Sequence, residues 1–444
     1  MKRSAWRYLW TAQDIRRKLL WTVAFLAIYR LASHIPVPGV DRALITKIMT
    51  GGGGVSTLVN LLDLFSGGTV SNFSVMAMGV YPYITAQIIL QLLVPIIPAL
   101  QKRMEEDPRQ GQKWMEKWTF ILAVPMAALN AIGQINIFGT FAGTPVIKNF
   151  GLAYPLTSIT IILSMTAGTM FAIWMGELIS EYGIRNQGLS LIIFAGIVSR
   201  VPRTISTIAA DAQNRWIGLA LLVIFSTLVI FAIVFVQQGQ RNIPVMYPGR
   251  RVGSRMSMPV KGTLPLRVNL AGMIPLIFAQ SLLTFPAIIA SFFVNAKTVW
   301  VANIATGIKN AFGGGSTIYY VLYFVSVVAF TFFYTDILFA QQNYGENLKK
   351  MGAQVAGVPR GALTQKYLTK VLRRITFPGA FFLGLVAILP WLISLVVPFG
   401  QSTGGLLLVS SAGLLIVVGV VRDTFFVIEA ELKLHGYDDS LLIR

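Results

Sequence analysis

The stretch IYYVLYFVSVVAFTFFYTDILF, residues 318–339, decides the fold. It carries a single charged side chain, Asp336, close to its end. A helix of a soluble protein has one apolar face and one polar face, whereas this stretch is apolar on every side. About 20 apolar residues are enough for a helix to cross a bilayer. The stretch is therefore a predicted transmembrane span.

Nine more stretches of the same kind follow from the hydropathy of the chain. With 318–339, they predict an all-α, polytopic membrane protein of about ten transmembrane helices. The fifth is short, and the segment before the first, residues 1–18, mixes aromatic and basic residues as an interfacial amphipathic segment does. The other predicted spans are 19–37, 75–97, 118–138, 156–176, 189–203, 216–236, 270–294, 376–398 and 404–421.

Composition supports this class and excludes most chemistry. The 444 residues are 55% hydrophobic and only 12% charged, against about 25% charged in soluble domains. The chain has no cysteine and two histidines, His34 and His435. It contains neither an HExxH motif nor a phosphate-binding loop. We therefore expect no enzyme activity, no metal and no cofactor.

The net charge of +20 has an ordinary explanation, because cytoplasmic segments of membrane proteins are rich in Lys and Arg. With the N-terminus inside, the inside segments hold 28 of the 37 Lys and Arg residues and the outside segments hold 8. This asymmetry predicts that both termini, including the tail 422–444, are cytoplasmic.

Two inside segments are unusually long, 237–269 and 340–375. They carry 13 basic residues and one acidic residue, Glu346. One interpretation is that they are solvated loops that set the topology. The other is that they dock something acidic, such as ribosomal RNA or an acidic protein face. The docking candidates are Arg241, Arg250, Arg251, Arg255, Lys349, Lys350 and Arg360.

Residues 51–79 form a glycine-led apolar segment that is too interrupted to span. Asp63 and Asn72 break it before the second span begins. Such a half-length segment is either re-entrant or an outside helix, and protein or water must shield it from lipid. A re-entrant segment usually lines or blocks a pathway.

Several long strings closely resemble one family. They are LFSGGTVSNFSVMAMGVYPYITAQIILQLL (64–93), GTMFAIWMGELISEYGIRNQGLSLIIFAGIV (168–198), GQRNIPVMY (239–247), LPLRVNLAGMIPLIFAQSLLTFPA (264–287) and NLKKMGAQVAGVPRGALTQKYLTKVLRRIT (347–376). The family is SecY, which provides channel subunits of Sec translocases, and the likeness runs from about residue 15 to 435. It implies two inverted five-helix halves, 19–203 and 216–421, that open sideways to lipid.

The resemblance also implies an hourglass pore closed by a ring of apolar side chains. The i,i+4 spacing of the first two pairs of that ring places each pair on one helix face, and an apolar ring gates by dewetting. Without the resemblance, ordinary packing within a span is the better explanation of each residue. The implied ring residues are Val80, Ile84, Leu189, Ile193, Ile277 and Ile416.

By the same resemblance, a plug helix occupies about 58–71, and a lateral gate lies between spans two and three and spans seven and eight. Thr85, Asn130 and Asn269 would form a polar cluster at that gate, or each would bond its own backbone or face water. The implied plug residues are Leu61, Leu62, Leu64, Phe65, Gly67 and Gly68.

The chain departs from the family pattern twice. Gly357–Gly361 reads Gly-Val-Pro-Arg-Gly where the family usually has Gly-x-Arg-Pro-Gly, which moves the loop arginine, and Asp336 is an acid where the family is commonly apolar or small.

The resemblance implies a protein-conducting channel subunit of the bacterial plasma membrane, which passes unfolded secretory polypeptides outward and releases membrane segments sideways into lipid. The implied partners are SecE, SecG, the ATPase SecA, the ribosome, precursor polypeptides and membrane lipid. A secondary transporter for a small solute is the main alternative, since transporters also contain broken segments; a scaffold without transport is a third. An aliphatic pathway favours the channel, and a polar or ionised pathway favours the transporter.

Overall fold

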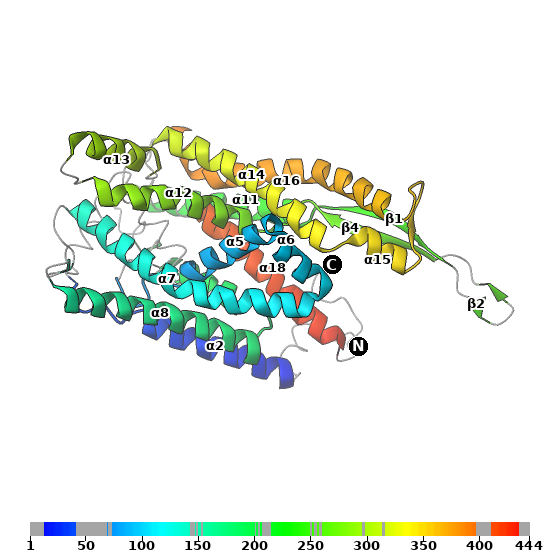
Figure 1. The fold of residues 1–444 in the computed structure, drawn as a ribbon, viewed down its shortest axis with the longest axis horizontal. Helices are drawn as coiled ribbons and strands as arrows, with labels where there is room; N and C mark the ends of the chain where they lie inside the picture. Colours follow the sequence, from blue (N-terminus) through cyan, green and yellow to red (C-terminus); the bar gives the residue numbers. More distant parts are fainter. Residues whose placement is uncertain are drawn as a thin grey trace.

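The helices of this protein run roughly side by side along its long axis, and a β-hairpin projects from one end (Figure 1). The structure is a computed structural model. It describes residues 13–40, 69, 73–142, 147, 150–151, 154–199, 201–202, 205–206, 215–248, 251–252, 255–256, 260–294, 298–312, 316–396 and 410–434.

Each predicted span coincides with a helix of the described chain, which confirms the all-α class. Apolar runs without a polar face form these helices because a helix satisfies every backbone hydrogen bond internally. The helices are α2 (Gln13–Ala32), α5 (Tyr81–Ile96), α7 (Pro108–Ala142), α8 (Pro155–Tyr182), α9 (Gly188–Val198), α11 (Arg215–Gln238), α12 (Ile274–Phe293), α14 (Thr317–Gln341), α16 (Ala362–Val396) and α18 (Ser410–Leu434).

Length and composition alone identify fewer crossings than ten. Among the described residues, four helices, α7, α8, α14 and α16, contain a stretch long and apolar enough to cross a membrane. A fifth crossing results if α5 and α6 (Pro98–Glu106), which meet at a 96° bend, count as one broken span. The apolar stretches of α9, α11 and α12 are shorter. The number of crossings, about ten, stays a prediction.

Several helices begin or end away from the predicted boundaries. α2 starts at Gln13 and stops at Ala32 rather than covering 19–37, because Pro36 and Pro38 follow and proline does not continue a helix. At the other end of the chain, α18 continues through Leu434 into the segment predicted as a tail. Hydropathy marks the apolar part of a helix, whereas the helix itself extends into water.

The first long inside segment is not a loop. Residues Gln240–Tyr247 (β1) and Val260–Arg267 (β4) form an antiparallel hairpin, paired from Gln240↔Arg267 to Tyr247↔Val260. Two short strands, β2 (Arg251–Val252) and β3 (Arg255–Met256), pair near its tip. β5 (Gln354–Val355), from the second long segment, adds to β1, so the strand order is β4-β1-β5. The two segments predicted separately are thus one folded unit.

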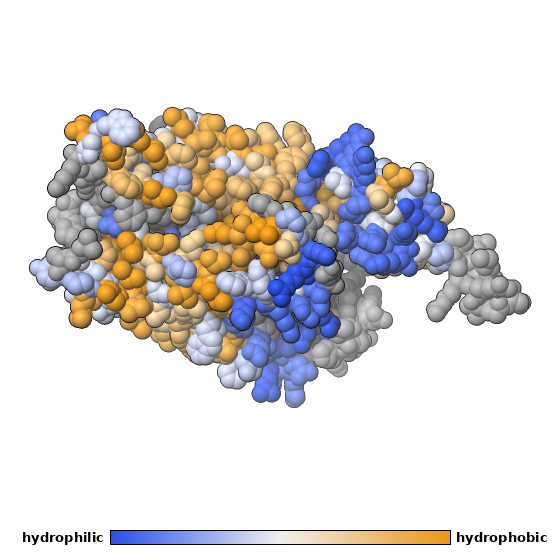
Figure 2. Space-filling view, viewed as in Figure 1, coloured by the Kyte–Doolittle hydropathy of each residue, from blue (hydrophilic) through white to orange (hydrophobic). Residues whose placement is uncertain are grey.

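Side chains divide the molecule into an apolar body and a polar end. Figure 2 shows apolar side chains over the helices and hydrophilic side chains around β1, β4 and α15 (Tyr344–Lys350). The largest apolar core joins residues of most of the long helices. A further helix, α13 (Val299–Phe312), packs on α12 at the end opposite the hairpin (Figure 1).

Candidate functional site

Six aliphatic residues are implied as a pore ring, here called the collar, and all of them belong to the largest apolar core or pack against it. Val80, Ile193, Ile277 and Ile416 are 1%, 3%, 4% and 0% exposed. The other two members, Ile84 and Leu189, are partly buried against the same core. The collar therefore gathers residues of α5, α9, α12 and α18, which lie far apart in the sequence.

Local sequence places collar residues at the starts of their helices. Val80 is the residue before α5, and that helix has a proline in its first turn. Gly79 has a φ of +52°, a conformation that glycine adopts without strain. α12 also has a proline, Pro275, in its first turn, and Gly272, two residues before the helix starts, has a φ of +65°. Proline fixes the φ angle that the first helical turn needs, so these sharp entries set where Val80 and Ile277 lie.

A close approach of two helices positions the second pair, Leu189 and Ile193. A Cβ on Gly188 would lie 1.8 Å from the carbonyl oxygen of Gly176, so only glycine fits where α9 starts against α8. Leu189 then packs beside Gly176, and Ile193 follows one turn later on the same face of α9.

A collar of this kind offers no hydrogen bond and no charge. A hydrated ion would have to lose water without compensation, which costs many kcal/mol; a narrow apolar passage also empties of water. Ordinary packing of neighbouring helices produces the same burial, so the role of the collar stays a prediction.

The predicted plug residues Leu61, Leu62, Leu64, Phe65, Gly67 and Gly68 lie outside the described residues. Beside them, Thr69 donates its hydroxyl to the carbonyl of Met76 at 2.7 Å. Phe73 is fully buried with a φ of +42° and packs edge-on against Phe138. Phe73 thus belongs to a second apolar core, separate from the largest one, which also includes Ile135, Phe138 and Ile161.

Two of the three predicted gate residues share one cavity. A cavity of about 180 Å³ lies between α5, α7 and α12, and Thr85 and Asn130 are part of its wall. Ser281 and Phe285 of α12 line the same cavity. Asn269 is not in that wall: its Nδ2 donates to the carbonyl of Gly272 at 3.1 Å, in the turn before α12.

No hydrogen bond joins Thr85, Asn130 and Asn269 to one another among the described residues. The Thr85 hydroxyl is within bonding distance of two carbonyls of its own helix, those of Tyr81 (3.0 Å) and Pro82 (2.9 Å). This is the local alternative that the sequence left open, and the polar cluster in its predicted form is not found.

Two other polar contacts, which the sequence analysis missed, connect the predicted halves. The Tyr334 hydroxyl of α14 lies near the side chain of Gln91 on α5, and both residues line one small cavity. The Tyr81 hydroxyl of α5 faces Ser281 of α12, without the geometry of a full hydrogen bond, since the Ser281 hydroxyl has no partner that meets it. The sequence feature that could have indicated the first contact is Gln91 itself, a polar amide inside an apolar run.

The polar end of the molecule is a folded unit, here called the basic lobe: β1, β4, β5, α15 and the first turns of α16. Its own apolar core, which includes Ile243, Val245, Leu348 and Leu368, joins both long segments. The guanidinium of Arg267 lies 5.3 Å from the centre of the Phe426 ring, which links the lobe to α18.

The predicted docking residues lie on this lobe or in its hairpin. Arg241, Lys349, Lys350 and Arg360 are exposed. Arg251 and Arg255 belong to β2 and β3 near the hairpin tip, and Arg250 lies outside the described residues.

Arg360 belongs to the Gly-Val-Pro-Arg-Gly turn that departs from the family pattern. Gly357 and Gly361 have φ angles of +78° and +92°, and the Thr364 hydroxyl donates to the carbonyl of Pro359 at 2.6 Å. The turn presents the arginine to solvent between β5 and α16.

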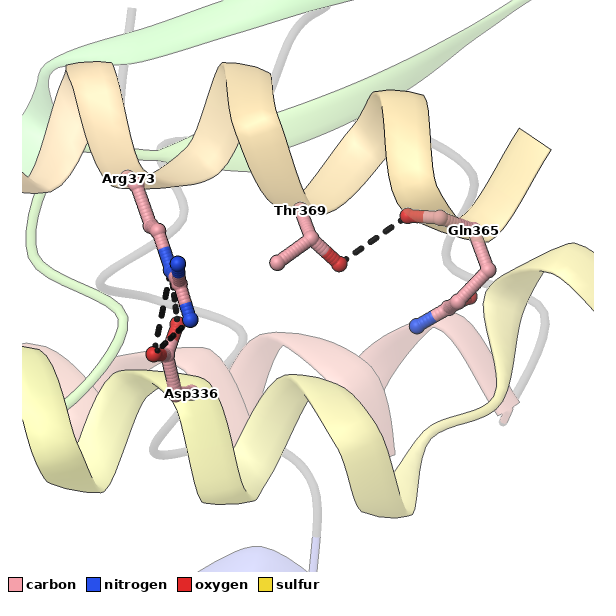
Figure 3. Close-up of polar contacts among 4 residues, drawn as sticks. All are labelled: Asp336, Gln365, Thr369 and Arg373. Carbon is pink, nitrogen blue, oxygen red and sulfur yellow. Dashed lines mark hydrogen bonds and ion pairs between the residues drawn. The ribbon is translucent and has the colours of Figure 1, made fainter. Parts of the chain in front are cut away.

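Polar contacts hold α16 against α14 and α15 (Figure 3). Arg373 donates to both carboxylate oxygens of Asp336, with Nη2 at 2.8 Å from Oδ2 and Nε at 3.2 Å from Oδ1. About two turns further out, Gln365 accepts from the backbone N–H of Gly345 at 2.7 Å. Asp336, unusual for the family, thus has an interhelical partner.

Among the described residues, no three His, Cys, Asp or Glu side chains are grouped so as to hold a metal ion.

An apolar helical body, an aliphatic centre and one basic end define a multi-span membrane protein. The SecY family model matches residues 74–425. The SecY subunit of the protein translocase of Aquifex aeolicus is 38% identical over 439 residues, covering 97% of each chain. The corresponding Escherichia coli K12 subunit is 36% identical over 436 residues, covering 96% of this chain and 94% of its own. This chain belongs to the SecY family.

Solved structures share the fold. A protein-conducting channel superposes with a TM-score of 0.60 at 19% identity, covering 96% of this chain and 95% of its own. Sec61 of a canine ribosome–channel complex superposes with a TM-score of 0.58 at 19% identity and the same coverage.

Proposed function

We propose that this protein is the channel subunit of a protein translocase. It would pass unfolded secretory polypeptides across the membrane and release apolar segments sideways into lipid. The observation that carries the proposal is the collar: six aliphatic side chains from four helices in one core. Membership of a family whose relatives are translocase subunits supports it.

An aliphatic collar suits a passage for many sequences. It asks no particular hydrogen bond of the chain that passes, yet it gives a hydrated ion no favourable site. A related SecY has a plug domain that stabilises the closed state and maintains a membrane seal. We propose the same role for residues 58–71.

Sideways release would take place where α5 and α7 meet α12 and α14. The cavity beside Thr85 and Asn130 lies at this junction, and the contact of Gln91 with Tyr334 crosses it. Hydrogen bonds between membrane helices contribute about 0.6 kcal/mol on average. Contacts this weak can keep a gate closed and still let it open.

The basic lobe would dock the cytosolic partners. A motor must supply energy, since the chain contains no phosphate-binding loop. We propose SecA and the ribosome as the docking partners, SecE and SecG as companion subunits, and lipid as the lateral surroundings. The exposed Arg241, Lys349 and Arg360 suit an acidic face or RNA.

We place the chain in the bacterial plasma membrane with both termini in the cytoplasm. The Lys18 ammonium of α2 lies 2.7 Å from the Glu431 carboxylate of α18, so the first and last described helices have their outer ends on one side. The asymmetry of Lys and Arg makes that side cytoplasmic. We expect no catalysis by this subunit itself.

The transporter alternative has less support. Ion-coupled transporters keep ionisable groups near the bilayer midplane, whereas the residues gathered at the collar are aliphatic.

Reconstitution tests the proposal. The chain would be inserted into vesicles with its companion subunits, and a signal-bearing precursor, SecA and ATP would be added. We expect the precursor to become protected from added protease only when SecA and ATP are both present. Complete digestion with all components present, in vesicles shown to hold folded protein, would contradict the channel function.

A further inference from the structure

Helix α13 has three distinct faces. Its packed face contacts α12 and includes the buried Ala305. Its only charged residue, Lys309, is partly buried, and burial lowers the pKa of that amine. The remaining surface of the helix is open.

The open surface is divided between an apolar and a polar stripe. Trp300, Ile304 and Ile308 are 71%, 46% and 37% exposed, and their i,i+4,i+8 spacing places them in one line. Asn303 and Asn310 are also exposed. With 3.6 residues per turn they fall on a separate line beside the apolar stripe, and Val299, 73% exposed, begins that line at the first residue of the helix.

The apolar stripe continues the surface that the neighbouring helices turn to the membrane. On α12, Leu282 and Phe285 are 55% and 57% exposed, and on α14, Ile318 and Val321 are 60% and 54% exposed. α13 itself has 14 residues, about 21 Å at 1.5 Å per residue, too short for a hydrocarbon core of about 30 Å. It therefore does not cross, although one of its faces is apolar.

We infer that α13 is an interfacial helix that inserts Trp300, Ile304 and Ile308 into the lipid leaflet opposite the basic lobe, with Asn303 and Asn310 toward water. An exposed tryptophan at the helix start suits the membrane–water interface, where this side chain is enriched. Because α13 packs on α12, it anchors the end of that helix in the leaflet. The inference needs only that the chain spans a membrane, not that it conducts protein.

The absence of cysteine in the whole chain permits a direct test with single nitroxide labels. Labels would be placed on the apolar stripe at W300C, I304C and I308C. The matched controls are N303C, next to Ile304, and N310C, two residues after Ile308. The full chain, purified with its companion subunits, would be reconstituted into phosphatidylethanolamine–phosphatidylglycerol vesicles. Collision with oxygen, which concentrates in lipid, would be compared with collision with a water-soluble nickel chelate.

We expect oxygen collisions to dominate on the apolar stripe and nickel collisions to dominate on the polar stripe. Dominant nickel collisions on both stripes would mean that α13 lies in water. Low collision rates for both reagents on the apolar stripe would mean that protein covers it. Either result overturns the inference, whatever the transport activity of the preparation.

A second variant tests the anchor. I304N/I308N should move a label at W300C from the oxygen-rich to the nickel-accessible regime, whereas N303S/N310S should leave it unchanged. A label at V321C on α14 reports whether the body of the protein is intact. If the W300C label stays oxygen-rich in I304N/I308N while the V321C label is unchanged, the stripe does not hold the helix in lipid.

Discussion

At the scale of single residues, Ile84 and Ile277 offer the sharpest test of the collar. Changing both to serine should raise the resting ion conductance of planar bilayers, because hydroxyls let water into an apolar constriction. Protein passage should survive, since a moving polypeptide needs only a compliant opening.

The matched control is Ile135→Ser with Ile161→Ser. These two isoleucines are 4% and 2% exposed, at least as buried as Ile277 and Ile84, and belong to a separate apolar core that contains no collar residue. They should lower stability without adding conductance. Wild-type conductance in a folded I84S/I277S channel would remove the collar from the seal.

Tyr334 tests the gate contact with Gln91. Tyr334→Phe removes only the hydroxyl, so apolar segments should leave sideways at a lower hydrophobicity threshold. An average membrane hydrogen bond of about 0.6 kcal/mol corresponds to a roughly threefold change in partitioning. The measurement is the fraction of a graded series of test segments that inserts.

Tyr323→Phe is the control on the same helix, because the buried Tyr323 hydroxyl has no hydrogen-bond partner in the described part of the chain. It should leave the threshold unchanged. Equal thresholds for Tyr334→Phe and wild type would show that the contact does not hold the gate.

At the residue scale, the sequence identified polar positions on single helices but not the contacts between helices. Thr85 and Asn130 were predicted as polar positions and do share a cavity. Their bonding was not predictable, because the Thr85 hydroxyl finds acceptors on its own helix. Gln91 and Tyr334 meet across a sequence separation that no local pattern encodes.

At the scale of elements, the charges of the basic lobe should matter more than those of a neighbouring helix. Reversing Arg241, Lys349 and Arg360 to glutamate should weaken binding of SecA or ribosomes, and wild-type binding should fall with added salt. A binding titration at two ionic strengths measures both effects.

Charge reversal of Arg109, Lys113 and Lys117 is the control. These exposed residues of α7 are predicted to lie on the same side of the membrane but outside the lobe, and the change in net charge is equal. If both triple variants bind alike, bulk charge and not the lobe attracts the partner.

The contact of Gln365 with Gly345 should stabilise the corner between α14 and α15. Gln365→Ala leaves the Gly345 N–H without this acceptor, at a cost of about 1–3 kcal/mol if that group stays buried. We expect faster amide hydrogen exchange across Tyr344–Lys350.

Thr369→Ala, one turn along α16, removes a hydroxyl that donates to the carbonyl of Gln365 on its own helix at 2.9 Å. It should leave exchange in α15 nearly unchanged. Equal exchange in both variants would mean that the corner depends on packing alone.

The sequence did not reveal that the two basic segments fold together. Ile243 and Val245 alternate with exposed residues as in a strand, but Pro244 and the shortness of the run conceal the pattern. The partner strand β5 has only two residues. A unit assembled from such short pieces becomes visible only through its shared core.

At the scale of the whole molecule, the orientation of the chain in the membrane is still a prediction. In the cysteine-free chain, Lys350→Cys should react with an impermeant maleimide only from the cytoplasmic face, and Asn303→Cys only from the opposite face. Labelling of each site would be measured in vesicles with the cytoplasmic face outward and in vesicles of the opposite orientation. Labelling of both sites from the same face would contradict the predicted orientation.

The sequence predicted the existence and order of the long helices because apolar runs of this length have few alternatives in lipid. It did not predict where α2 or α18 ends, because hydropathy identifies only the apolar part of a helix and not the parts that extend beyond the membrane. It also did not predict the 96° bend between α5 and α6, where Ile97 is extended before Pro98.

The placement of collar residues at helix starts has an electrical consequence. Val80, Leu189 and Ile277 precede or occupy the first turn of α5, α9 and α12. Each helix start carries about half a positive charge, and hydrocarbon surroundings screen it poorly. We therefore expect a positive potential at the collar that no formally charged side chain creates. A polypeptide that enters with basic residues at its front would be slowed at the collar. The helix backbones themselves would then help to decide which end of the translocated polypeptide stays on the cytoplasmic side.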